Sequence, residues 1–161
     1  MKTREMKKVL IALDYDPTAK KIAETGYAIA RAMGAEVTLL HVITDPIFYY
    51  SSDYSTIMGF SGYMDMSPYQ LDNVNGLKNA AQYFLDTTKQ HLGNETIQTL
   101  VLEGDFADVI LATAKTMHAD MIVLGSHSHR WLEDVLIGSV TEKLLHHSSI
   151  PLFIIPTKKH K

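Results

Sequence analysis

The chain alternates between short, almost continuously apolar runs and longer segments whose apolar residues recur at helical spacing. Runs rich in Val, Ile and Leu lie at residues 9–13, 37–42, 97–102, 121–124 and 152–155 of the 161 residues. A strand has a continuous apolar run when both of its faces are covered, as in a parallel sheet between helices. The alternation therefore predicts a single three-layer α/β/α domain with a five-stranded parallel sheet.

Helix patterns separate these runs. Asp105 with Asp108 is typical of an N-terminal capping pair, and Asp16 followed by proline is another common helix start. The last helix is expected to begin near Gly138 and to end before the Ser-Ser pair at 148–149. Helical spacing predicts the inward-facing residues, which are Ile22, Gly26, Ile29, Ala30 and Met33, then Leu77, Ala81, Phe84, Leu85 and Thr88, then Phe106, Val109, Ile110, Thr113 and Met117, and finally Val140, Leu144 and Leu145.

Residues 44–74 interrupt this rhythm with a long stretch rich in tyrosine and methionine. A connection of this length in a compact domain is usually functional or mobile. Two interpretations stay open, because adaptable Tyr and Met side chains suit both. The segment packs on the domain or on a second subunit, or it closes over a ligand.

Composition narrows the class of function. The formal charge is −3 and the isoelectric point about 6.2, which argues against a nucleic-acid binder with a broad basic surface. The absence of cysteine excludes disulfides, thiol nucleophiles and cysteine-ligated metals. The apolar runs are far shorter than the roughly 20 residues that span a bilayer, and residues 1–8 do not predict a secretion signal. We expect a soluble cytoplasmic protein that binds neither nucleic acid nor membrane.

Small and polar residues gather where the first and fourth runs end. In a parallel sheet, ligands bind in the crevice beyond the carboxyl ends of the strands. Asp14 follows the first run, where a carboxylate accepts hydrogen bonds from ribose hydroxyls or caps the next helix. Gly125 ends the fourth run and allows the backbone to approach a ligand closely. Gly138, Ser139 and Thr141 begin the last helix, whose amides and hydroxyls favour a phosphate.

The order of these features resembles the universal stress protein family over residues 7–156, including a second strand that ends in His41 and Val42. The most specific piece resembles the motif of the ATP-binding subgroup, Gly-x-x-Gly-x(nine)-Gly-Ser/Thr. Gly125 matches the first glycine and Gly138 with its following serine matches the last pair, with the same spacing. Ser128 stands at the middle glycine position, which is a departure from the motif.

The resemblance implies binding of ATP or AMP, with a Mg²⁺ ion able to bridge the phosphates, by a stress-response regulatory protein. It also implies the strand order 3-2-1-4-5 of the adenine nucleotide alpha hydrolase-like fold. The implied contacts are Ala12 and Leu13 on the adenine side, Asp14 at the ribose and phosphates, the Val42 backbone at the adenine edge, Leu124 and Gly125 under the ribose, His127, Ser128 and His129 beside the phosphates, and Gly138, Ser139, Val140 and Thr141 around them.

The fifth strand in this order is a sheet edge too apolar to leave open. We therefore expect a homodimer in which the strand pairs with its copy about a two-fold axis, as the resemblance also implies. The residues at this edge are Leu152, Phe153, Ile154 and Ile155.

No lysine follows the glycines in the manner of a P-loop, and no catalytic base or metal ligand set is identifiable. We therefore expect hydrolysis to be absent or very slow. Two alternatives remain. Ser128 favours a dimeric interaction protein that leaves the crevice empty, and the fold is also compatible with a weak nucleotide-hydrolysing enzyme. In the main hypothesis, bound nucleotide orders residues 44–74 and shifts the surface that partners meet.

Overall fold

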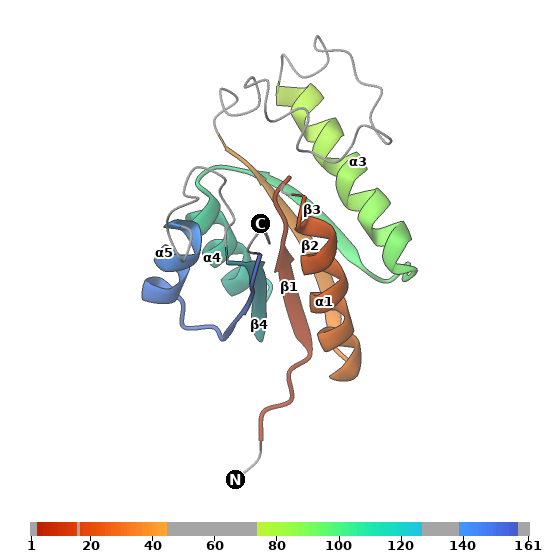
Figure 1. Cartoon of the computed structure of the whole chain (residues 1–161). Coiled ribbons are helices and arrows are strands. Elements are labelled where there is room, and N and C mark those ends of the chain that lie inside the picture. The colour runs from red at the N-terminus through yellow and green to blue at the C-terminus, as the bar shows by residue number, and fades with distance from the viewer. Residues whose placement is uncertain (1–2, 16, 45–73, 127–138, 158–161) are drawn as a thin grey trace.

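Strands and helices alternate through the chain (Figure 1). This computed structural model describes residues 3–15, 17–44, 74–126 and 139–157, so the predicted loop at 44–74 lies outside them except for its two end residues. The elements are β1 (Lys8–Ala12), α1 (Ala19–Ala32), β2 (Glu36–Ile43), α3 (Val74–Leu92), β3 (Gln98–Glu103), α4 (Phe106–Thr116), β4 (Met121–Gly125), α5 (Ser139–His147) and β5 (Leu152–Ile155).

The five strands form one parallel sheet in the order β3-β2-β1-β4-β5, as predicted. β1 occupies the middle, because Val9 pairs with Val37 of β2 on one side and with Met121 of β4 on the other. The chain extends from β1 towards β3 on one side and from β4 towards β5 on the other. The switch point of the sheet therefore lies between β1 and β4, where ligands bind in open α/β folds.

Two separate cores cover the two faces of the sheet. Helices α1 and α3 pack on one face and α4 and α5 on the other, as Figure 1 shows on either side of the strands. Along β1, Val9 and Ile11 face the α1/α3 core, whereas Leu10 faces the α4/α5 core. Both faces of the central strands are thus buried, which explains why their sequences are continuously apolar. None of the helices in the described ranges is long and apolar enough to cross a membrane.

Helix ends match the sequence pattern in one case and differ in another. Asp105 caps α4, since its Oδ1 accepts a hydrogen bond from the Asp108 amide at 3.1 Å, as predicted. The start predicted at Asp16 is wrong, because α1 begins at Ala19. Thr18 precedes the helix with helical backbone angles and makes no side-chain capping bond, and its carbonyl accepts the Ile22 amide at 3.0 Å.

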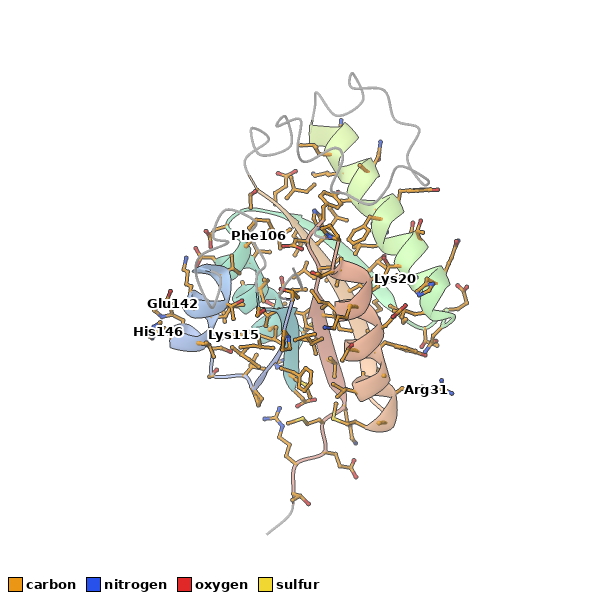
Figure 2. All side chains as sticks on the ribbon, in the orientation of Figure 1. Lys20, Arg31, Phe106, Lys115, Glu142 and His146 are labelled. Atoms are coloured by element: carbon orange, nitrogen blue, oxygen red, sulfur yellow. The ribbon has the colours of Figure 1, made fainter. Side chains whose placement is uncertain are left out.

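The inward face of α5 also differs from the prediction. Val140 and Leu144 are buried in the α4/α5 core, but Leu145 is 49% exposed. Adjacent residues point about 100° apart around a helix, so Leu144 and Leu145 cannot both face the same core. Glu142 and His146 project from the outer side of α5, as Figure 2 shows.

Two glycines lie where helix α1 packs on the sheet. A Cβ atom on Gly26 would lie 2.9 Å from Ile11 Cδ1 and 3.0 Å from Val123 Cγ1. A Cβ on Gly125 would lie 2.5 Å from Ile22 Cδ1 and 2.9 Å from Thr157 Cγ2. A side chain at the end of β4 would therefore force the Ile22 and Thr157 side chains to shift, so packing favours glycine there independently of any ligand.

A buried histidine lies within the α1/α3 core. His41, in β2, is 1% exposed, and its ring centroid lies 4.2 Å from that of Tyr15 and 6.0 Å from that of Phe84. Its Nδ1 lies 2.9 Å from the carbonyl oxygen of Leu13. Burial lowers the pKa of His41 from 6.5 to about 4, although the bond to Leu13 opposes that shift. The ring is therefore neutral near pH 7.

We expect Gly125→Ala to lower the free energy of unfolding by about 1–3 kcal/mol through overpacking against Ile22 and Thr157. Ile22→Val removes the Cδ1 atom that the new methyl group meets, so the double variant should recover part of this loss. Urea unfolding of the wild type, both single variants and the double variant measures the coupling. Purely additive effects would contradict the proposed contact.

The buried ring of His41 also predicts a pH dependence of stability. The unfolded state takes up a proton near pH 6.5, whereas folded His41 resists protonation down to about 4. The unfolded state thus binds more protons in this interval, and stability falls as the pH falls. The expected loss from this group is about 2 kcal/mol between about pH 7.5 and pH 5.

His41→Asn provides the control for this pH effect, because asparagine fills part of the space and does not titrate. Chemical unfolding at both pH values should show a clearly smaller loss in the variant than in the wild type. Equal losses in the two proteins would mean that His41 is not the group responsible.

Candidate functional site

The predicted site residues belong to four element ends around the switch point of the sheet. Ala12 ends β1, Val42 lies near the end of β2, and Leu124 lies near the end of β4. All three pack on the α4/α5 face, where Val42 and Leu124 are buried and Ala12 is partly buried. The structure thus places the side chains of these predicted residues on one face of the sheet, at its carboxyl edge.

Leu13 differs from its predicted neighbour Ala12, because its side chain is buried in the opposite core, under α1 and α3. The backbone of Leu13 is therefore the part that can face a ligand on the α4/α5 side. Its amide still donates to the Leu40 carbonyl at 2.9 Å, one residue beyond the end of β1. Asp14, the next residue, is half-buried in the connection to α1.

The orientation of the Val42 backbone follows from the ladder register. In a parallel strand, alternate residues direct their N–H and C=O groups towards opposite neighbours. The Leu40 carbonyl accepts from Leu13 beside β1, whereas the Ile43 carbonyl accepts from Gly104 beside β3. Val42 shares the orientation of Leu40, so its backbone groups point to the β1 side of the strand, beyond Ala12 where β1 ends. A planar base at this position would meet both a donor and an acceptor.

The N-terminus of α5 is fastened to the end of β4. Thr141, fully buried, donates its hydroxyl hydrogen to the carbonyl of Gly125 at 3.1 Å. The hydroxyl proton of Thr141 is therefore used in a hydrogen bond within the fold. Val140 is likewise buried in the α4/α5 core through its side chain. Both residues lie in the first turn of α5, where backbone amides lack intrahelical acceptors.

A second hydroxyl cluster joins the ends of β4 and β5. The Ser126 Oγ atom accepts the Thr157 amide at 3.0 Å and lies 3.2 Å from the Thr157 hydroxyl oxygen. The Ser126 amide donates to the Ile155 carbonyl at 2.9 Å. These contacts extend the β4–β5 ladder past its last residues and hold the end of β4 in place beside α5. Sequence reasoning missed this pair, since serine and threonine after a strand are common in loops.

Charged groups near the start of α5 are paired with α4. Lys143 contacts Asp105 at 3.2 Å and Asp108 at 2.9 Å. The Asp108 amide, more than the Lys143 ammonium, lowers the pKa of Asp105, and the two carboxylates raise the pKa of Lys143. The described parts of the chain contain no cluster of three or more His, Asp or Glu residues suited to a metal ion.

Part of the predicted site lies outside the described residues. This applies to His127, Ser128, His129 and Gly138, while Ser139 is described as the first residue of α5. The roles assigned to these positions stay predictions. Sequence reasoning also did not find the bond from His41 to Leu13, although a histidine inside an otherwise apolar run is a visible signal.

Known proteins resemble the chain over nearly its full length. Universal stress protein MJ0577 of Methanocaldococcus jannaschii is 27% identical over 156 residues, covering 94% of this chain and 96% of that protein. Its solved structure superimposes with a TM-score of 0.69 at 23% identity, covering 98% of this chain and 100% of the other.

Two further solved structures share the fold at lower identity. A universal stress protein family protein from Arabidopsis thaliana with AMP bound has a TM-score of 0.60 and 20% identity, covering 94% of this chain and 92% of that one. A universal stress protein in complex with cAMP has a TM-score of 0.59 and 16% identity, covering 94% and 98% of the two chains. The sequence model of the universal stress protein family matches residues 5–156. The parallel sheet with its switch point between β1 and β4 is thus accompanied by a family match over almost the whole chain, and this protein belongs to the universal stress protein family.

Proposed function

We propose that the crevice at the carboxyl ends of β1 and β4 binds an adenine nucleotide, ATP or AMP, and that the protein acts as a nucleotide-responsive stress regulator in the cytoplasm. The observation that carries this proposal is the bond from Thr141 to the Gly125 carbonyl. It holds the N-terminus of α5 at the switch point, so that the amides of the first helical turn and the positive end of the helix dipole lie beside the crevice. Such a helix end favours a phosphate.

The other side of the crevice suits a nucleoside. The Val42 backbone directs a donor and an acceptor past the end of β1, which matches the hydrogen-bonding edge of adenine. Asp14 lies two residues beyond the end of β1, where a carboxylate would accept hydrogen bonds from ribose hydroxyls. Solved family members contain AMP and cAMP, which supports an adenine nucleotide as the ligand class.

We do not propose that the protein hydrolyses the nucleotide. Lys143 on α5 forms ion pairs with Asp105 and Asp108 at the start of α4. The described residues include no metal-binding cluster. A Mg²⁺ ion would therefore be held mainly by the phosphates themselves. The protein's own contribution is binding, and its output is the shift in conformation or partner surface that bound nucleotide stabilises, with residues 44–74 as the proposed responding segment.

One observation favours the alternative of an empty crevice. Packing against the Ile22 and Thr157 side chains favours glycine at position 125 with or without a ligand. The first motif glycine is thus weaker support for a nucleotide than the motif alone suggests. Ser128 departs from the motif as well. In this alternative the protein is a dimeric stress-response interaction protein that binds no nucleotide.

Isothermal titration calorimetry with ATP and AMP distinguishes the two functions. We expect Asp14→Asn to weaken binding about tenfold, because it removes one charged acceptor from the ribose contacts. Gly138→Val should abolish binding by placing a side chain among the phosphates. Asp86→Asn is the matched control, since Asp86 is an exposed aspartate of α3 that contacts Gln82.

The calorimetry is read together with thermal melts of each variant, which confirm that the variants remain folded. Wild-type protein that binds neither nucleotide would contradict the proposal and favour the empty crevice. Unchanged affinity in Gly138→Val would place the phosphates elsewhere.

We also propose that the protein is a homodimer through β5. Within the described sheet β5 is a terminal strand, and it pairs with β4 along one edge. Phe153 is 37% exposed, Leu152 and Ile154 are half-buried, and Ile155 is buried. Pairing of this apolar edge with its copy would bury the exposed ring and satisfy the open backbone groups.

Phe153→Lys should convert the dimer to a monomer, because an edge lysine opposes strand pairing. Leu100→Lys is a closely matched control, since Leu100 is also 37% exposed and lies on β3 at the other edge of the sheet. Light scattering after gel filtration measures the mass of all three proteins. A monomeric wild type, or equal effects of both lysines, would contradict the β5 interface.

A further inference from the structure

The β1–β2 ladder ends with a hydrogen bond from a side chain instead of one from a backbone amide. Ala12 pairs with Leu40, and the Leu13 amide donates to the Leu40 carbonyl. In this register the Val42 amide is the next donor in line for the Leu13 carbonyl. In the described residues the bond to that carbonyl comes from Nδ1 of His41 at 2.9 Å. A histidine donor thus occupies the place where the ladder would otherwise continue.

The protonation state of the ring follows from its surroundings. A carbonyl oxygen only accepts, so Nδ1 must carry the hydrogen and Nε2 the lone pair. Nε2 is buried and has no hydrogen-bond partner within the described structure. A second proton on Nε2 would create an unpaired charge among Tyr15 and Phe84, so the neutral Nδ1–H form is the stable one.

The ring is also held in orientation. The Tyr15 ring lies at 38° to it with centroids 4.2 Å apart, and the Phe84 ring meets it nearly edge-on at 86°. Tyr15 and Phe84 contact each other as well, with centroids 5.3 Å apart. Aromatic contacts on two sides restrict rotation of the imidazole, so the direction of the Nδ1–H bond is set before any ligand arrives.

We propose that His41 is the positioning residue of the nucleotide site, which ends the β1–β2 ladder and thereby presents Asp14 and the Val42 backbone to the adenine nucleoside. This inference rests on the proposed nucleotide binding. His41 itself lies on the α1/α3 side of the sheet and acts through the backbone rather than by touching the ligand.

Two covalent connections transmit this effect. The Leu13 carbonyl and the Asp14 amide belong to one planar peptide unit, so the bond to His41 fixes the plane from which Asp14 projects. Val42 is the residue after His41 and faces the opposite side of the sheet, so holding the ring also holds the Val42 backbone. Because His41 donates a hydrogen bond to the Leu13 carbonyl, the Val42 amide is not needed there and can donate to an incoming base.

Asparagine and glutamine test which ring nitrogen matters. The side-chain amide of asparagine reaches the place of Nδ1, whereas that of glutamine reaches the place of Nε2. His41→Asn therefore keeps a donor for the Leu13 carbonyl, and His41→Gln does not. We expect His41→Asn to bind ATP within about threefold of the wild type and His41→Gln to bind at least tenfold more weakly. Both amides are neutral and polar, so burial cost is closely matched.

The measurement is calorimetry with ATP at a temperature where thermal melts show all three proteins folded. Amide ¹H–¹⁵N spectra without nucleotide provide a readout that overall stability does not move. Both variants lack the imidazole ring current, so the variants are compared with each other, and we expect the Asp14 and Val42 signals to differ between His41→Asn and His41→Gln. Equal ATP affinity in His41→Gln and wild type, or an equal loss in both variants, would overturn the inference.

Failure of the proposed function is distinguishable from failure of this inference. Wild-type protein that does not bind ATP overturns nucleotide binding and the role of His41 in it together, whereas normal wild-type binding with an unaffected His41→Gln variant overturns only the latter. If His41→Gln does not fold, the ring ¹⁵N shifts of the wild type decide. A ring protonated on Nδ1 supports the proposal, and one protonated on Nε2 overturns it.

Discussion

The close contact between helix α1 and the two central strands is the constraint on which the rest of the structure depends. Gly26 allows α1 to rest on Ile11 and Val123, and Gly125 allows Ile22 to reach the end of β4. A helix that approaches a sheet this closely has little freedom to shift, since interiors are packed to crystal-like density. The backbone ladder sets the register of β1 and β4, and this contact fixes α1 across the pair, over one face of the switch point between them.

The candidate site is built outward from that contact by hydrogen bonds to backbone groups. On one side, Thr141 joins the start of α5 to Gly125. On the other, His41 joins the end of β2 to Leu13. In both cases a buried polar side chain satisfies a strand-end carbonyl that regular secondary structure leaves open. These bonds exist without a ligand, so the proposed nucleotide site would need little ordering on binding.

The sequence predicted the sheet better than it predicted the site. Strands covered on both faces must be apolar throughout, so their number, order in the chain and parallel arrangement were readable from the runs alone, and the strand order followed from the family resemblance. The prediction that Leu145 faces inward is wrong. In a short helix with two adjacent leucines, the sequence does not show which of the two faces the core. Helix α1 starts later than the proline signal indicates, since a proline is equally compatible with the preceding turn.

Site roles were harder to predict, because one residue type serves several purposes. The sequence predicts that the Thr141 hydroxyl contacts a phosphate, whereas in the structure this hydroxyl donates its hydrogen to the Gly125 carbonyl. His41 appeared to be only the end of a strand, because a hydrogen bond between a side chain and a carbonyl 28 residues away leaves no local pattern. Asp14, Val42 and Leu124 were placed at the carboxyl edge correctly, since topology decides where strand ends meet.

The close packing around Gly125 has a consequence for how such motifs are used to assign function. A glycine that packing against neighbouring side chains already favours is kept whether or not a ligand is bound, so it carries less information about binding. Informative positions are those whose residue the scaffold leaves free and only the ligand restricts. Among relatives of this chain, a glycine at the end of the fourth strand is therefore evidence of this packing first and of a ligand only second.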